Sequence, residues 1–131
     1  MKILPVLAFL TAVALAPFAL GAESTPAAAP AKRQFLYVLR LVTRLHDDKA
    51  WTPADNEIIG RHFNRLKAAT ERGQVILAGR TTESGDKTMG LVIFEAADED
   101  AAREFMNTDP AVVGNLMTAT LHPYAIAVRA K

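Results

Sequence analysis

The stretch HFNRLKAATERGQVILAG, residues 62–79, decides the fold, because within it a helix gives way to a strand. Its first half continues an apolar stripe that begins near Ile58 and recurs at helical spacing. Gly73 then suits the end of a helix, where a left-handed residue is commonly needed. QVILAG, at 74–79, is rich in strand-forming residues. The stretch therefore predicts a long helix followed at once by a strand.

The residues before this stretch predict how the helix begins and what precedes it. Thr52 is suited to cap the helix, Pro53 to occupy its first position and Asp55 to lie near its positive end. We therefore expect the helix to run from Pro53 to about Arg72. Upstream, FLYVLRLVT at 35–43 predicts a first strand, and a polar loop follows over 45–51.

The residues after it predict a second helix between two more strands. MGLVIFEA at 89–96 is strand-like, and a turn-rich segment with Ser84-Gly85-Asp86 at its tip precedes it. Asp98 or a neighbour caps a helix that ends near Thr108, and Asp109-Pro110 starts a short helical turn through about residue 115. TLHPYAIAV at 120–128 is the last strand, in which Pro123 argues for an edge or a bulge.

The resulting order, βαββαβ, predicts an α+β fold of the ferredoxin-like kind. It is an antiparallel four-stranded sheet with two helices on one face. The first strand is apolar on both faces, with Phe35, Tyr37 and Leu39 pointing one way and Leu36 and Val38 the other. A second apolar face left in water would be a large sticky patch. We therefore expect two copies to pack sheet to sheet as a homodimer.

The N-terminus predicts export. Met1-Lys2 is followed by an almost wholly apolar run, and Ala19-Leu20-Gly21 resembles a signal-peptidase site. An uncleaved membrane anchor is the alternative, but Pro5, Pro17 and the small-residue end favour cleavage and no stable membrane insertion. We expect a signal peptide at 1–21, a flexible linker at 22–33, a domain at 34–131, and a periplasmic or secreted location.

Composition excludes several functions. The 15 Lys and Arg residues nearly balance the 14 Asp and Glu residues, which gives no electrostatic case for a nucleic-acid partner. The chain has no cysteine, so disulfides, cysteine catalysis and cysteine-ligated zinc are excluded. The histidines lie at no spacing typical of a metal site, and nothing indicates a cofactor.

His62 is the most informative titratable residue. It falls between Ile58 and Leu66 within the apolar stripe of the predicted helix, so it is either a core histidine bonded to a carbonyl or a residue facing a pocket. Asp109 before a proline is ordinary N-cap chemistry when taken alone. His122 is a strand-end residue that either bonds a loop or faces a ligand.

The remaining charged candidates have ordinary explanations. His46 lies in LHDDKAW and is expected in a solvated loop. Arg80, just after the second strand, is a solvated turn arginine or a contact for an anionic ligand. The basic residues of the first helix are expected to form a normal solvated face; they are Arg61, Arg65, Lys67 and Arg72.

In their order, four segments resemble the YCII-related family, small proteins of the dimeric α/β-barrel group. They are FLYVLRLV, HFNRLKAATERGQVILAG, FEAADEDAAREFMNTDPAV and TLHPYAIA. The resemblance covers about 34–128. It departs from the family pattern at Arg80, where a proline is common, and at Ala111, where an aromatic residue is often found.

The resemblance implies a catalytic pair of His62 and Asp109. An aspartate beside an imidazole fixes its tautomer, and such a pair moves protons on a bound small molecule. Related folds include isomerases, cofactor-free monooxygenases and a dehydrochlorinase, which implies a lyase or isomerase without cofactor or metal. His122 and Arg80 are further ligand-binding candidates. A small-ligand-binding protein without turnover and a structural dimerisation module remain as alternatives.

Overall fold

The computed structural model describes residues 28–29 and 31–131, so the predicted signal peptide and most of the predicted linker lie outside the described residues. In the described part, no helix is long and apolar enough to cross a membrane. The strands and helices, in chain order, are β1 (Arg33–Leu41), α1 (Pro53–Glu71), β2 (Val75–Arg80), β3 (Met89–Ala96), α2 (Glu99–Asn107), α3 (Pro110–Val113) and β4 (Met117–Pro123). Short 3-10 turns add η1 (Thr43–His46), η2 (Asp48–Ala50) and η3 (Gly85–Lys87).

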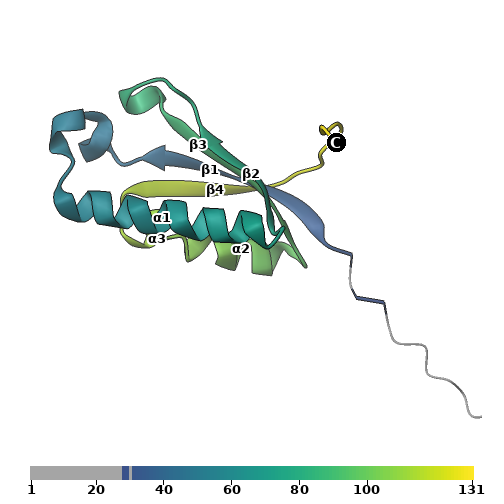
Figure 1. Ribbon diagram of the computed structural model, residues 1–131. Coiled ribbons are helices and arrows are strands. Elements are labelled where there is room, and N and C mark those ends of the chain that lie inside the picture. The colour runs from purple at the N-terminus through teal and green to yellow at the C-terminus, as the bar shows by residue number, and fades with distance from the viewer. Residues whose placement is uncertain (1–27, 30) are drawn as a thin grey trace, which may run out of the picture.

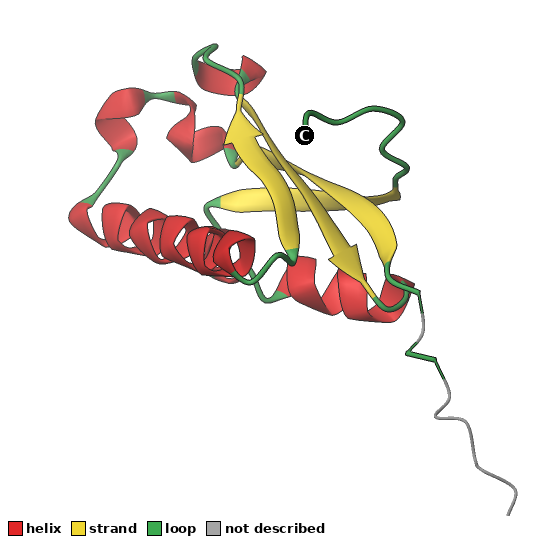
Figure 2. Cartoon of the chain, turned by 45° about the vertical axis from the view of Figure 1, so that its right-hand side comes forward, coloured by secondary structure: helices red, strands yellow, loops and turns green. Residues whose placement is uncertain are grey.

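The four strands form one antiparallel sheet in the order β2-β3-β1-β4. All three α-helices lie on the same side of this sheet (Figures 1 and 2). The predicted α+β ferredoxin-like fold is therefore confirmed. The short helical turn expected after Asp109 is α3, which makes three helices where the sequence predicted two and a turn.

The start of α1 is built as the sequence predicts. The Thr52 hydroxyl accepts a hydrogen bond from the backbone N–H of Asp55 at 3.2 Å, and the Asp55 carboxylate accepts one from the N–H of Thr52 at 2.9 Å. Arg44 adds two hydrogen bonds to this carboxylate at 2.8 and 2.9 Å. Leu45, next to Arg44, is buried as well as Asp55. The segment at 45–51, which was expected to be a polar loop, is therefore packed against the rest of the protein at Leu45.

The core lies between the helices and the face of the sheet that they cover. The predicted alternation of β1 is confirmed, since Phe35, Tyr37 and Leu39 on the helix-facing side are at most 2% exposed while the residues between them are half-buried. Burying such a side chain contributes about 1.5–3 kcal/mol. The core comprises Phe35, Tyr37, Leu39, Leu66, Ala69, Val75, Val92, Phe94, Ala96, Ala102 and Met106.

The last strand differs from its prediction. It begins three residues earlier than expected and ends at Pro123, which has no N–H to continue the ladder. Tyr124 and Ile126 donate their N–H groups to the backbone and side chain of Gln34 instead. The expectation that this strand continues to residue 128 is therefore wrong.

Gly114, which ends α3, allows that helix to approach α1 closely. A Cβ atom at this position would lie 2.8 Å from Cγ2 of Ile58 and 2.9 Å from the carbonyl oxygen of Pro110. Ile58 is one turn before His62 on α1, so this contact helps to set the distance between the two helices that carry the predicted pair.

Gly114→Ala is expected to lower the free energy of unfolding by about 1–3 kcal/mol, because the added methyl group overpacks the contact. The matched control is Gly60→Ala in the interior of α1, where a Cβ would meet nothing within 4 Å. That exchange is expected to stabilise by about 0.5–1 kcal/mol, since alanine is the better helix former. Urea unfolding measures both; equal effects at the two positions would contradict the close approach.

Candidate active site

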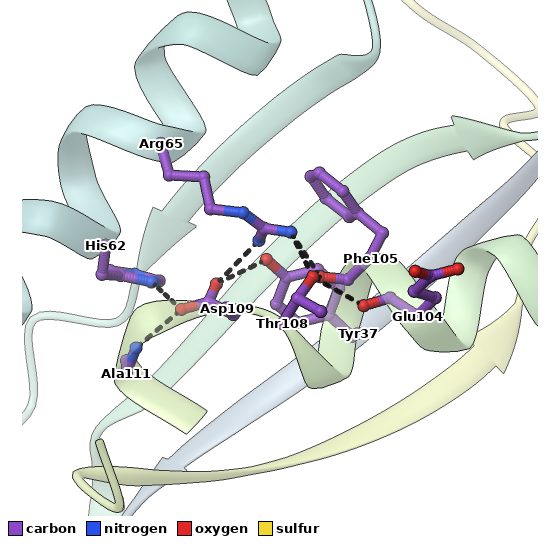
Figure 3. Close-up of polar contacts among 8 residues, drawn as sticks. All are labelled: Tyr37, His62, Arg65, Glu104, Phe105, Thr108, Asp109 and Ala111. Atoms are coloured by element: carbon purple, nitrogen blue, oxygen red, sulfur yellow. Dashed lines mark hydrogen bonds and ion pairs between the residues drawn. The ribbon is translucent and has the colours of Figure 1, made fainter. Parts of the chain in front are cut away.

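Asp109 is a buried carboxylate whose hydrogen-bond partners come from three elements of the fold. Its side chain has no solvent exposure. Oδ1 accepts a hydrogen bond from the N–H of Ala111 at 2.9 Å, so the N-cap explanation is correct for this residue. The same oxygen lies 2.6 Å from Nδ1 of His62, and Oδ2 accepts a bond from the Tyr37 hydroxyl at 2.8 Å (Figure 3). Capping and pairing with His62 thus coexist in one carboxylate.

His62 connects this carboxylate to a cavity. Its side chain is 13% exposed, and it lines the space between α1 and the sheet. Because an ionised carboxylate only accepts hydrogen bonds, Nδ1 of His62 carries the proton in the contact with Asp109. Nε2 has no protein partner among the residues that the structure describes. In the neutral ring Nε2 is then a lone-pair acceptor available to a ligand.

The surroundings keep Asp109 ionised. Burial by itself raises the pKa of this carboxyl, but the hydrogen bond and charge of His62, the Ala111 N–H and the Tyr37 hydroxyl together hold the pKa below its ordinary value. Burial and the adjacent charge of Asp109 raise the pKa of Tyr37 well above its ordinary value. Tyr37 therefore remains a hydroxyl that donates to the carboxylate.

Arg65 is part of the site, and the expectation that it belongs to a solvated helix face is wrong. Its Nη1 atom lies 3.7 Å from Oδ2 of Asp109, and Nη2 donates to the Phe105 carbonyl at 2.8 Å and to the Thr108 hydroxyl at 2.9 Å (Figure 3). The guanidinium lies over the ring of Phe105, 4.2 Å from its centroid. Arg65 thereby ties α1 to the end of α2, just before Asp109.

A cavity of about 630 Å³ lies beside His62. Most of its lining is apolar, and it includes Leu39 and Leu66 of the core together with the more exposed Phe63. Arg80, from the end of β2, lines it as well. Pockets of this size and character suit a small organic ligand.

The other histidines lie elsewhere. His122 pairs with Leu36 in the sheet, on the face opposite the helices, and is exposed there. The structure therefore does not bring this ligand-binding candidate to the cavity. His46 belongs to η1, where Nε2 lies 3.2 Å from the carbonyl oxygen of Leu41. Within the described residues, no three His, Asp or Glu side chains gather where they could hold a metal ion.

Two residues of the site, Tyr37 and Arg65, were not predicted from the sequence. Tyr37 was placed on the correct face of β1, but strand alternation does not indicate that its hydroxyl meets a carboxylate. Arg65 is three residues after His62 and so lies on the same side of α1. That spacing was the available signal for Arg65.

Asp109→Asn is expected to weaken the pH dependence of the free energy of unfolding in the acid range. The folded-state pKa of Asp109 lies below its ordinary value of 3.8. Its contribution to stability is therefore complete above that value and is lost as the pH falls through the folded-state pKa. Between about pH 6 and pH 3, the free energy of unfolding should fall less steeply in the variant than in the native protein.

Urea unfolding at several pH values measures this difference. Asp98→Asn is the control, since it replaces another N-cap aspartate, that of α2, with a residue that also caps well. Native and Asp109→Asn curves of equal steepness would contradict an ionised, paired Asp109.

A search of curated proteins found no match. Among solved structures, the chain is similar to 5-chloro-2-hydroxyhydroquinone dehydrochlorinase (TftG) from Burkholderia phenoliruptrix AC1100, in complex with 2,5-dihydroxybenzoquinone. The identity is 18% and the TM-score 0.47, over 70% of this chain and 93% of that one. The sequence profile of the YCII-related domain matches residues 38–120, more than half of the chain. The chain therefore belongs to the YCII-related domain family.

Proposed function

We propose that the cavity is the active site of a cofactor-independent enzyme of the lyase or isomerase type. His62 is its general acid and base, and the substrate is a small organic molecule. The observation that carries the proposal is the 2.6 Å contact between Asp109 and Nδ1 of His62, on a ring that also lines the cavity. This arrangement presents Nε2 to a ligand in a fixed orientation and tautomer.

The proposed step needs only a proton acceptor. Nε2 of His62 removes a proton from a C–H bond of the substrate, and the electron pair of that bond forms a new double bond. In a lyase reaction a leaving group on the adjacent carbon departs with its own bonding electrons. The imidazolium then passes its proton to the departing group or to water. In an isomerase reaction an existing double bond shifts as the new one forms, and the imidazolium returns the proton to the carbon at its far end. Either route restores the neutral ring for another cycle and uses no redox step.

The groups behind His62 support this role. Asp109 is a positioning residue, since it is fully buried behind the ring and stabilises the imidazolium that forms during proton transfer. Tyr37 and Arg65 hold the second oxygen of that carboxylate. The apolar cavity wall keeps water away from the reacting carbon, and the Asp109 carboxylate offsets the cost of forming an imidazolium in such surroundings.

His62→Gln is expected to remove proton transfer while keeping a hydrogen-bonding side chain in place. A suitable probe is nitrobenzisoxazole, whose ring opens to a coloured nitrophenolate when a base removes its C–H proton. The native protein should accelerate this reaction over buffer, and the variant should lose roughly a hundredfold or more of the acceleration. The control is His46→Gln, outside the cavity, which should keep the native rate.

Two results would contradict the proposal. One is a native protein that does not accelerate the probe reaction, which would favour ligand binding without turnover. The other is an equal rate in His62→Gln and the native protein, which would remove His62 as the base.

A second part of the proposal is that the chain is a homodimer through the open face of its sheet. Leu77, Ile93 and Leu36 lie side by side on three neighbouring strands of this face, followed by His122 on β4. Leu77 is 62% exposed in the single chain. A contiguous apolar face of this kind supports association, because it removes apolar surface from water.

Val38→Glu is expected to convert the dimer to a monomer, because the exchange places a charge between Leu91 and Thr120 near the middle of the open face. Light scattering after size exclusion measures the mass. Val128→Glu is the matched control, since Val128 is 91% exposed beyond the end of the sheet. A native monomer, or a dimer that survives Val38→Glu, would contradict this interface.

Export is the third part of the proposal and rests on the sequence of residues 1–21 alone. Expression with a C-terminal tag in a bacterial host, followed by the intact mass of the recovered protein, tests it. Cleavage after Gly21 or a neighbouring residue is expected. An uncleaved chain held in the membrane fraction would support the anchor instead.

A further inference from the structure

The charged residues around the cavity are all basic. Lys67 and Arg80 line it, and none of the described residues in its lining is Asp or Glu. The two cations come from different elements, Lys67 from α1 and Arg80 from the end of β2. The electrostatic potential in the mouth of the cavity is therefore positive, which favours an anion.

These two cations lack carboxylate partners within the described residues, whereas other arginines have them. Arg44 pairs with Asp55, and Arg103 pairs with Glu99. Arg80 makes one hydrogen bond there, from Nη1 to the adjacent Thr81 carbonyl at 3.2 Å. Its remaining donors are free for a ligand, and a guanidinium binds a carboxylate through two parallel hydrogen bonds.

A glycine, Gly90, lies beside Arg80 in the lining of the cavity. In the sheet, Arg80 pairs with Gly90, and Gly90 pairs with Leu39, so all three positions belong to the helix-facing side. A Cβ on Gly90 would lie 3.1 Å from Cβ of Leu39. Because Gly90 has no side chain, Leu39 packs directly over it, and the apolar part of the cavity begins next to Arg80.

We propose that the cavity binds a small organic carboxylate with an apolar body. The carboxylate lies between Lys67 and Arg80, and the apolar body lies against Leu39, Leu66 and Val92. This proposal rests on the proposed function in one respect, namely that the reacting C–H bond of such a molecule is placed at His62. A carboxylate fits better than a phosphate ester, because the chain offers two separate side-chain cations here and no glycine-rich loop of N–H groups.

The test compares arylalkanoates, from phenylacetate to phenylbutyrate, with their primary amides, which have nearly the same shape and no charge. NMR titrations that follow the backbone N–H chemical shifts of the full chain give the dissociation constant of each compound. The native protein is expected to bind at least one carboxylate roughly tenfold more tightly than its amide, as two charge-assisted contacts allow. The double variant Lys67→Met and Arg80→Met, which keeps apolar side chains of similar length, should lose this preference.

The control is the double variant Arg61→Met and Lys87→Met. It removes the same charge from exposed positions of α1 and η3 that do not line the cavity, and it should keep the preference. Three results would overturn the proposal: no binding of any carboxylate, equal binding of carboxylate and amide, or a preference that survives loss of Lys67 and Arg80.

Titration of His62→Gln separates this proposal from the proposed function. The variant should retain the preference for carboxylates, since the cations that create it are unchanged. If His62→Gln keeps the preference for carboxylates and also keeps the native rate on the benzisoxazole probe, the catalytic role of His62 is contradicted and the proposed ligand class is supported. If the rate depends on His62 but the protein shows no preference for carboxylates, the catalytic role is supported and the proposed ligand class is contradicted.

Discussion

The carboxylate of Asp109 is the group on which the arrangement of the site depends. An isolated charge without solvent exposure would be strongly unfavourable, so its hydrogen bonds must be present whenever the protein is folded. Those bonds come from Tyr37 on β1, His62 on α1 and Ala111 on α3. Satisfying one buried charge thus fixes the relative positions of a strand and two helices. The orientation of the His62 ring follows from the same requirement.

The core and the site share their supporting residues. The rings of Tyr37, Phe94 and Phe105 are in mutual contact, with centroids 4.9–6.2 Å apart. Tyr37 also donates to Asp109, and Phe105 accepts the stacked guanidinium of Arg65. Because aromatic packing holds the groups that position the carboxylate, the imidazole is supported by well-packed residues on one side. On its other side it borders the cavity, so a ligand bound there would meet His62 and not the buried Asp109.

Local features of the sequence predicted most of the fold. The capping residues Thr52 and Asp98, the helix stop at Gly73 and the alternation of β1 each depend on a few neighbouring residues. The last strand was misplaced at its end, because the point where pairing stops depends on Gln34 in another strand as much as on Pro123. The face on which His122 lies depends on its pairing with Leu36 in β1, which local sequence does not indicate. That pairing places His122 on the side of the sheet away from the cavity.

The site was harder to predict, because its contacts join residues far apart in the chain. His62 and Asp109 are 47 positions apart, and their pairing was expected from the family resemblance, while local sequence indicated only an N-cap. Arg65 has the charge typical of a solvated helix residue, and its spacing from His62 was the one local signal to the contrary. Its true surroundings depend on Phe105 and Thr108, which α2 brings to it only in the folded chain.

The proposed role of Asp109 is to fix the tautomer of His62 so that Nε2 faces a ligand as a base. Long-range proton–nitrogen NMR correlations of the His62 ring, recorded under mildly alkaline conditions, report directly which nitrogen carries the proton. We expect a proton on Nδ1 and a lone pair on Nε2 in the native protein, and a weaker preference for this tautomer in Asp109→Asn. A native ring protonated on Nε2, as is usual for free histidine, would contradict the claim.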